Sequence, residues 1–262
     1  LNVIEEELKK NNQRLAFEPI DFGYLFTGKS NKGTAAGQVS CNISGPRRFK
    51  VGSIRDHVLG FRGVNGKGEI IKSGGNVVKN VTGYDLSKLI CGSYGTLVIL
   101  TEITFKVLPT PQVSQTLIIH ELNLENACDF LNKSLNSPND ISGAVFLPTK
   151  PNCIECAMNI EKTFKLNDLK HGGSLVAFRI EGSRNSINER IKLLEHELNV
   201  TSLKISRLGD YQSDIFWNKI KNLEVFTSTK NNIVRIVLPP SNSAQLIYQL
   251  SSKFKYYLDW GG

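Results

Sequence analysis

The sequence predicts an α+β fold built as two domains. Hydrophobic residues make up 40% of the 262 residues and charged residues 21%, which is typical of a globular protein that buries a core. Short β-branched runs alternate with amphipathic helical runs in the second half, whereas the first half is rich in glycine-containing loops. Pro109-Thr110-Pro111 separates the halves, so we expect domains over residues 1–110 and 111–262.

The first domain opens with an amphipathic helix over residues 2–13, for which Asn2 is the candidate cap. A second helix is expected after Thr34, because its hydroxyl can accept a hydrogen bond from the first turn of the small-residue run that follows. The remaining expected elements are a hairpin with a glycine-containing turn, a short helix and a long strand, at residues 57–64 with 69–72, 84–90 and 97–108.

The second domain alternates strand-like and helical runs, which indicates an antiparallel sheet with helices on one face. Its clearest helix is residues 187–198, where Ser186 and Glu189 stand in the capping-box relation. Further helices are expected near 124–135, 211–221 and 242–251. The expected strands are 113–120, 142–148, 174–181, 202–207 and 232–238.

The charge distribution favours an anionic ligand in the first domain. The net charge is +8, and residues 1–112 hold 15 basic and 9 acidic residues, against 17 and 15 in the remainder. The basic residues are scattered and are not interleaved with aromatic residues, so we expect no nucleic-acid partner. A phosphate-bearing cofactor fits this charge better.

Neither the cysteines nor the histidines form a convincing metal site. Cys153 and Cys156 have zinc-like spacing, but no second Cys/His pair accompanies them, and we predict no metal. Five cysteines without a framework indicate free thiols and a reducing compartment. The histidines are expected to be structural or surface residues; they are His57, His120, His171 and His196.

Two glycine-containing stretches are candidates for phosphate binding. Residues 33–45 are small and contain a helix start at Thr34, so backbone N–H groups can approach a pyrophosphate; a loop that merely turns the chain fits equally well. Residues 23–30 match the pattern G-x-x-x-x-G-K-S. Because no convincing strand precedes them and no helix follows, we interpret that match as chance.

The order of several motifs carries a resemblance to a known family. The motifs are Gly-Gln-Val-Ser-Cys-Asn-Ile-Ser-Gly-Pro-Arg-Arg, Val-Gly-Ser-Ile-Arg-Asp-His-Val-Leu-Gly, Lys-Asn-Val-Thr-Gly-Tyr-Asp-Leu-Ser-Lys-Leu, Gly-Ser-Tyr-Gly-Thr-Leu and Leu-Thr-Glu-Ile-Thr-Phe-Lys-Val-Leu-Pro, between residues 37 and 109. Together they resemble the PCMH-type (vanillyl-alcohol-oxidase) FAD-binding domain, and within it the FAD-binding subunits of bacterial glycolate oxidases. The match is strong over residues 34–109 and weak over 113–257, and the final residues 258–262 resemble a cap-domain strand.

The resemblance implies the second half of a PCMH-type FAD-binding domain, followed by an α+β cap domain with an antiparallel sheet. It also implies a fragment, because the family's N-terminal phosphate-loop subdomain and the segment after the cap are not found in this sequence. We therefore expect these residues alone to bind FAD weakly.

The resemblance also implies cofactor-binding residues for FAD, contacted largely through the main chain. Those expected at the pyrophosphate and ribose are Thr34, Gly37 and Gly45. Those expected along the cofactor are Gly52, Ser53, Asp56 and Val58, and those at the adenine or flavin edge are Gly95 and Ile99. Arg47 and Arg48 either balance phosphate charge or lie on the surface, and Asp85 is expected to cap a helix. No catalytic residue is identified.

The function implied by the resemblance is that of an FAD-binding subunit in a glycolate (2-hydroxy acid) oxidase complex. Its partners would be a flavin catalytic subunit and an iron–sulfur subunit, with a small 2-hydroxy acid as substrate. Such a complex would lie in the cytoplasm or at the inner face of the membrane. The alternatives are a self-sufficient FAD-dependent D-2-hydroxy acid dehydrogenase and a non-catalytic assembly subunit. Ala36, at a position where the family has glycine, favours the last.

Overall fold

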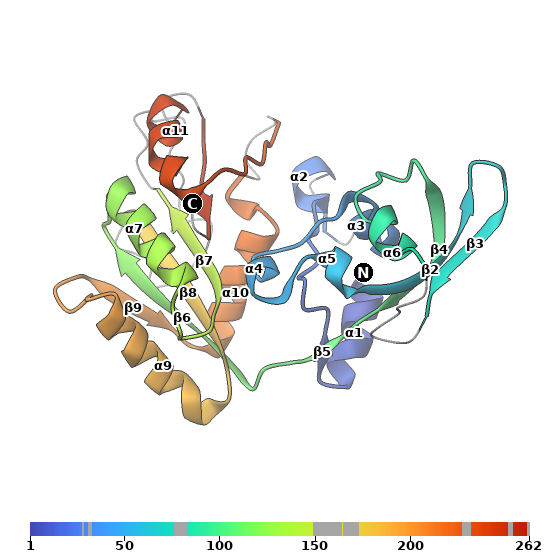
Figure 1. Ribbon diagram of the computed structural model, residues 1–262. Coiled ribbons are helices and arrows are strands. Elements are labelled where there is room, and N and C mark those ends of the chain that lie inside the picture. The colour runs from blue at the N-terminus through green and yellow to red at the C-terminus, as the bar shows by residue number, and fades with distance from the viewer. Residues whose placement is uncertain are drawn as a thin grey trace. The chain divides into compact units, whose positions relative to one another are not determined.

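The computed structural model describes residues 1–27, 29–30, 33–75, 83–148, 164, 173–226, 232–250 and 254–260. The chain divides into two compact units, Leu1–Thr110 and Pro111–Gly262 (Figure 1). Each unit has its own hydrophobic core. The identification of these units with a partial FAD-binding domain and a truncated cap domain stays a prediction.

The first unit contains short helices around a three-stranded antiparallel sheet with the order β3-β2-β4, and a separate two-stranded pair, β1-β5. Its elements are α1 (Asn2–Lys10), β1 (Gln13–Arg14), α2 (Gly23–Thr27), α3 (Ala35–Cys41), α4 (Arg48–Val51), α5 (Ile54–His57), β2 (Val58–Asn65), β3 (Ile70–Gly74), α6 (Leu86–Ile90), β4 (Val98–Phe105) and β5 (Leu108–Pro109).

The two faces of this sheet differ in what covers them. Directly paired residues share a face of a sheet, and Phe61 and Leu100 lie on the face that packs against the core of the first unit. On the other face, Ile70, Val64 and Ile99 are paired in one row across the three strands. Ile70 is 66% exposed and Ile99 71%, so this outer face is open to solvent.

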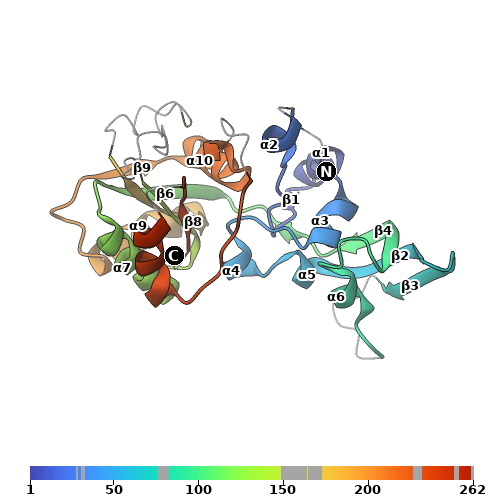
Figure 2. The same ribbon diagram turned by 90° about the horizontal axis from the view of Figure 1, so that it is seen from above.

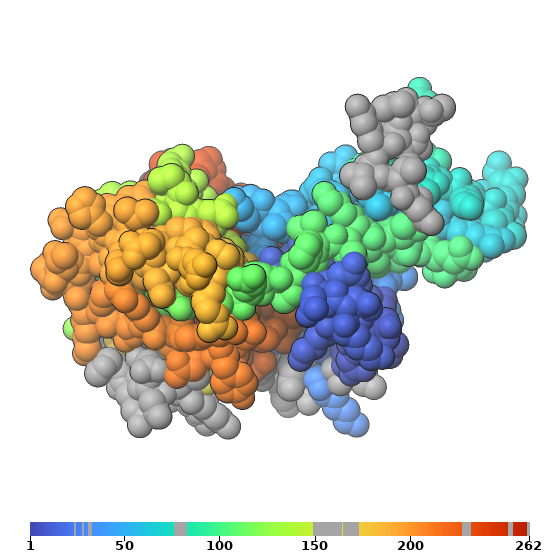
Figure 3. Space-filling view, turned by 90° about the horizontal axis from the view of Figure 1, so that it is seen from below, coloured from blue at the N-terminus to red at the C-terminus, as the bar shows by residue number. Residues whose placement is uncertain are grey.

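The predicted elements of the first unit are confirmed, with differences at their ends. The hairpin forms as predicted, and Gly68 supplies its positive φ of 81°. The long first helix is shorter than predicted and buries no residue; it forms the deep-blue surface in Figure 3. Leu1 and not Asn2 occupies its N-cap, without a side-chain hydrogen bond, so the predicted cap is wrong.

The second unit is a five-stranded antiparallel sheet in the order β10-β7-β8-β6-β9. Its elements are β6 (Val113–His120), α7 (Leu124–Leu135), β7 (Ile141–Leu147), β8 (Leu175–Gly182), α9 (Arg184–Glu197), β9 (Ile205–Leu208), α10 (Asp210–Lys221), η3 (Glu224–Phe226), η4 (Pro240–Asn242), α11 (Ser243–Leu250) and β10 (Leu258–Asp259). The units β6-α7-β7 and β8-α9-β9 interleave as two split β-α-β motifs, the ferredoxin-like arrangement.

Helices cover both faces of this sheet, which corrects the prediction of helices on one face. Leu117 and its face pack against α7 and α9, and α11 packs on the same cluster. The neighbouring residue Ile118 points to the other face, where it packs with Phe216 of α10. Figure 2 shows α7, α9 and α11 on one side of the strands and α10 on the other. The α+β class itself is confirmed.

Two further predictions in the second unit are wrong. Residues 232–238 form no strand although their β-branched residues favour one, and Val234 and Val237 stand 77% and 81% exposed. The long helix begins three residues earlier than predicted, with Ser183 as its N-cap; Ser186 lies inside the first turn and donates to the Ser183 carbonyl.

Candidate cofactor site

Thr34 and Gly37 build the start of α3. The Thr34 hydroxyl accepts a hydrogen bond from the Gly37 N–H at 3.0 Å, which is the predicted cap. A Cβ on residue 37 would lie 2.9 Å from that hydroxyl, so glycine is what allows the cap to close. The Gly37 N–H therefore already has an acceptor in the N-terminal cap of α3.

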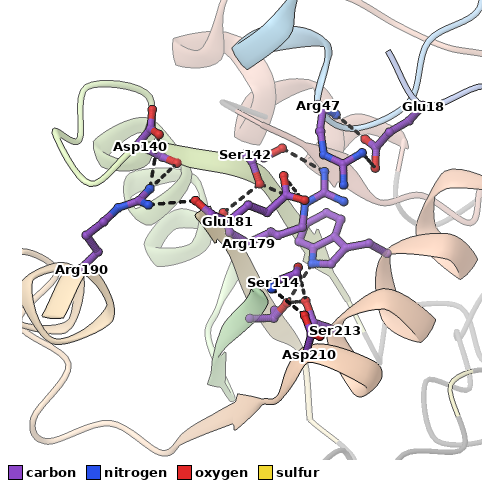
Figure 4. A network of polar contacts seen from close by, with 12 residues as sticks. Glu18, Arg47, Ser114, Asp140, Ser142, Arg179, Glu181, Arg190, Asp210 and Ser213 are labelled. Carbon is purple, nitrogen blue, oxygen red and sulfur yellow. Dashed lines mark hydrogen bonds and ion pairs between the residues drawn. The ribbon is translucent and has the colours of Figure 1, made fainter. Parts of the chain in front are cut away.

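Gly45 is held by the segment before it. Its N–H donates to the carbonyls of Phe17 and Glu18, at 2.9 and 3.0 Å. The Glu18 carboxylate accepts from the Arg47 N–H at 2.6 Å and pairs with the Arg47 guanidinium at 2.9 Å, as Figure 4 shows. Both side chains are nearly buried. Arg47 is thus neutralised by a carboxylate 29 residues away, a pairing that the sequence does not signal.

Residues 52–58 form a tight turn that leads into β2. Asp56 and Ser53 make a capping box for α5, in which the Asp56 carboxylate accepts from the Ser53 N–H at 2.8 Å and its hydroxyl at 3.1 Å. Gly52 has a φ of 87°, and a Cβ there would lie 2.8 Å from the same carboxylate. Val58 is buried at the start of β2.

The loop before β4 combines an open backbone with exposed apolar side chains. Apart from its two chain neighbours, none of the described residues has an atom within 4 Å of the position that a Cβ would take on Gly95, whose φ is 74°. Leu97 and Ile99 are 47% and 71% exposed. Because β4 is an edge strand among the described strands of its sheet, one side of its backbone pairs with none of them.

The structure brings three of the predicted segments together. The Tyr94 N–H donates to the Ser40 carbonyl at 2.8 Å, which ties the loop before β4 to α3. The Ile54 N–H donates to the Ser44 hydroxyl at 2.8 Å, which ties the turn at 52–58 to the segment after α3. The sequence order of the motifs therefore corresponds to a spatial cluster.

Only part of this cluster fits a dinucleotide cofactor. Five of the N–H groups expected at the pyrophosphate or along the cofactor are already used by protein acceptors; they belong to Gly37, Gly45, Gly52, Ser53 and Asp56. The backbone at Gly95, by contrast, is open toward the described residues, and the main chain of Ile99 lies in the edge strand β4. The residues present therefore leave more room for a cofactor at the edge of β4 than at the N–H groups expected to bind its phosphates.

Two exposed tyrosines, one before α6 and one in the loop before β4, were missed by the sequence reasoning. Tyr84 is 94% exposed and Tyr94 is 75% exposed with a φ of 54°, a conformation unusual for a residue with a side chain. A tyrosine inside each of the glycine-containing motifs was the available signal. Asp85 caps α6 by accepting from the Lys88 N–H at 3.2 Å, as expected.

Two titratable groups beside the cluster are held in their neutral forms. Burial lowers the pKa of His57, whose ring lies within the core of the first unit. Burial also raises the pKa of the Cys91 thiol to about 11, so this cysteine is a poor nucleophile near neutral pH. His57 is shut off from solvent by burial, and the Cys91 thiol stays protonated near neutral pH.

Several buried polar groups of the second unit contact one another. Arg179 is 2% exposed, donates to the Ser142 hydroxyl at 3.1 Å and stacks on Trp217 at 4.6 Å (Figure 4). The Trp217 indole N–H donates to the Thr116 hydroxyl at 2.9 Å. A Cβ on Gly143 would touch Trp217 at 3.0 Å, so the space beneath this tryptophan is filled.

The other candidate sites from the sequence, a phosphate-binding loop and a metal site, are not supported by the described residues. Residues 23–27 form a helical turn where a phosphate loop would need an open backbone, in agreement with a chance match. Among the described residues, no group of three or more metal-ligating side chains occurs. Cys153, Cys156, His171 and residues 79–82 lie outside the described part. Within that part, no helix has the length and apolar character needed to cross a membrane.

Comparison with known proteins gives relatives along the whole chain. No family model matches. The chain is 31% identical to "Glycolate oxidase subunit GlcE" of Escherichia coli over 263 residues, 100% of this chain and 61% of that protein. It is 42% identical to "Glycolate oxidase subunit GlcD" of Bacillus subtilis over 94 residues, 36% of this chain and 20% of the relative. "D-lactate dehydrogenase" of Anaerostipes hadrus is 45% identical over 126 residues, 48% of this chain and 25% of the relative.

The fold of the chain is also similar to that of a solved structure. A solved structure of alkyldihydroxyacetonephosphate synthase superposes with a TM-score of 0.62 at 19% identity, over 85% of this chain and 40% of that one. The chain spans 61% of the length of its E. coli relative, and smaller shares of the others. Over its whole length the chain is therefore similar to the glycolate oxidase subunit GlcE, and it shares its fold with alkyldihydroxyacetonephosphate synthase.

Proposed function

We propose that the chain is an FAD-binding subunit of a glycolate (2-hydroxy acid) oxidase complex. The observation that carries the proposal is the alignment with the glycolate oxidase subunit GlcE along all of this chain. The cluster of α3, the turn at 52–58 and the loop before β4 supports it, because these segments are the ones that the motifs single out.

FAD, when bound, accepts the equivalent of a hydride from the α-carbon of a 2-hydroxy acid. The residues of this chain would contribute binding and orientation. Gly95 and Ile99 would contact the adenine or flavin edge through the main chain, along the side of β4 that pairs with no other described strand. Thr34, Gly37, Gly45, Gly52, Ser53, Asp56 and Val58 would shape the adjoining wall, chiefly by holding the turns in place.

The proposed partners are other subunits of the same enzyme. Two relatives are named as glycolate oxidase subunits, and one of them, GlcD, is similar to this chain over 94 residues only. We propose that a flavin-containing catalytic subunit and an iron–sulfur subunit assemble with this chain. Their substrate would be a small 2-hydroxy acid.

Two alternatives each have an observation in their favour. The similarity to a D-lactate dehydrogenase over 126 residues favours a self-sufficient D-2-hydroxy acid dehydrogenase. The internal use of five N–H groups expected at the cofactor favours an assembly subunit whose flavin site has lapsed. Glycolate-dependent dye reduction by the chain alone would support the first alternative.

Titration with FAD tests the proposal directly. We expect weak but saturable binding, seen as quenching of flavin fluorescence, and about tenfold weaker binding for Ile99→Asp because it adds a negative charge at the strand proposed to contact the anionic cofactor. Ile70→Asp is the matched control, since Ile70 is similarly exposed in the same row but two strands away. No saturable binding up to millimolar FAD, or equal losses in both variants, would overturn the proposal.

A further inference from the structure

His57 ends α5 and lies directly before β2, at the end of the turn that carries Gly52, Ser53 and Asp56. Its ring is 2% exposed. The Nε2 atom lies 3.0 Å from the carbonyl oxygen of Val51, the last residue of α4. The ring therefore joins the two ends of the turn, from residue 51 to residue 57.

The hydrogen bond fixes the protonation of the ring. A carbonyl only accepts, so Nε2 carries the proton and donates to Val51. The other nitrogen, Nδ1, is buried and has no hydrogen-bond partner in the part of the chain that the structure describes. A buried polar atom without a partner destabilises the folded protein. A phenylalanine would fill a core position without that cost.

The surroundings hold the ring in one orientation. It packs against Phe17, with ring centroids 5.6 Å apart, and Phe17 packs in turn against Phe105. The backbone carbonyl of His57 accepts from the Lys106 N–H at 2.7 Å, which anchors the residue beside β4. The imidazole is thus a fixed support on which the turn closes.

We propose that His57 is a positioning residue for the cofactor: its Nε2–H holds the turn of Gly52, Ser53 and Asp56 in the shape that FAD contacts. This inference rests on the proposed function, because the same turn is part of the candidate FAD site. The Asp56 capping box closes the turn from within, and the His57 ring closes it from the core side. Loss of the ring donor leaves the capping box as the main restraint.

The test compares two substitutions that separate the donor from the ring. His57→Phe keeps the aromatic packing on Phe17 and removes the donor, whereas His57→Gln keeps a side-chain N–H at the reach of Nε2 and removes the ring. We expect His57→Phe to weaken FAD binding about three- to tenfold, the worth of one hydrogen bond, and His57→Gln to restore most of it. The bound flavin absorption band should shift in His57→Phe only.

His120→Phe is the matched control. His120 is also a buried histidine whose Nε2 makes a hydrogen bond, at 2.8 Å to the Ser206 hydroxyl, but it lies in the second unit. Its substitution should leave FAD affinity unchanged, and thermal unfolding would show that all variants are folded. If His120→Phe loses as much FAD affinity as His57→Phe, or if His57→Gln does not restore that affinity, the effect is one of general destabilisation. Either result would overturn the inference.

Hydrogen exchange without FAD gives a readout that does not depend on the cofactor. The N–H groups of Ser53 and Ile54 should exchange faster in His57→Phe than in the unmodified protein or His57→Gln. If the unmodified protein takes up no FAD, the proposed function fails, and this inference with it. If the unmodified protein and His57→Phe bind FAD equally, only the inference about His57 fails.

Discussion

The two units of the chain use glycine and apolar surface in opposite ways. In the second unit, both faces of the sheet are covered by helices, and buried side chains such as Phe178 and Phe216 fill separate clusters on either side. In the first unit, one face of the sheet packs on a small core and the other leaves Ile70 and Ile99 exposed. The sheet of the second unit is thus covered on both faces, whereas the sheet of the first unit has one exposed face.

The backbone shows the same difference. Among the described residues, every glycine with a positive φ lies in the first unit; these are Gly52, Gly68, Gly74, Gly83, Gly92 and Gly95. Such residues are needed where turns are tight or where the chain must leave room for a ligand. The comparison shows that tight turns made by glycine are a main feature of the first unit, whereas the packing of buried side chains is the main feature of the second.

Removing a core side chain from the second unit should have the largest effect. Phe178 is fully buried in the central strand β8, and we expect Phe178→Ala to lower the free energy of unfolding by about 3–5 kcal/mol. Both tryptophans, Trp217 and Trp260, lie in this unit, so urea unfolding followed by tryptophan fluorescence reports it. Tyr211→Ala, at a side chain 78% exposed, should change stability by less than about 0.5 kcal/mol. Similar losses for the two would contradict the packing argument.

A backbone change in the first unit comes next. Gly74 has a φ of 74°, and a Cβ there would lie 2.1 Å from the Leu59 carbonyl oxygen. Gly74→Ala should lower the free energy of unfolding of the first unit by at least about 1–3 kcal/mol, because the backbone at this position is strained for alanine and the added Cβ would displace β2. The loss should appear in far-UV circular dichroism and leave the tryptophan transition in place. Gly66→Ala is the control, because no described residue beyond its chain neighbours lies within 4 Å of its Cβ position, and an equal loss there would refute the argument.

How much of the fold the sequence predicts depends on how local its causes are. The Thr34 cap, the β2–β3 hairpin and α7 follow from neighbouring residues, and the structure has them where they were expected. Residues 232–238 have the composition of a strand, but a strand also needs a partner, and composition does not supply one. Ser183 and Ser186 both suit an N-cap, and only the packing of the helix decides between them.

The candidate site shows the same limit. Sequence motifs identify the segments that meet around α3, but they do not tell which N–H groups remain available. The Gly45 N–H is used by the carbonyls of Phe17 and Glu18, contacts that link positions almost thirty residues apart. The Glu18–Arg47 ion pair likewise uses the charge of Arg47, a residue that the local sequence suggested as a partner for a phosphate. Long-range pairing of this kind has no signature in a single sequence.

A smaller effect should come from the cap of α3. Thr34→Ala removes the acceptor of the Gly37 N–H, and we expect a loss of about 1 kcal/mol in the stability of the first unit. Thr34→Ser keeps the hydroxyl and should behave as the unmodified protein does. Circular dichroism during urea unfolding would measure both. A full loss in Thr34→Ser would show that the methyl group, and not the hydrogen bond, matters here.

The smallest expected effect is a dependence on pH confined to the first unit. Burial lowers the pKa of His57 below its ordinary 6.5; the charged groups acting on it are Asp56, which raises the pKa, and Lys106, which lowers it.

Because the unfolded chain binds the proton more readily, stability should be full above about pH 6.5 and should fall as the pH decreases below it. Urea unfolding at about pH 7.5 and 5.5 should show this loss by circular dichroism and not by tryptophan fluorescence. His57→Phe has no group to protonate there, so its stability should change less between the two pH values. A loss that persists undiminished in His57→Phe, or that shifts the tryptophan transition as strongly, would place the pH-sensitive group outside His57 and remove this contrast between the units.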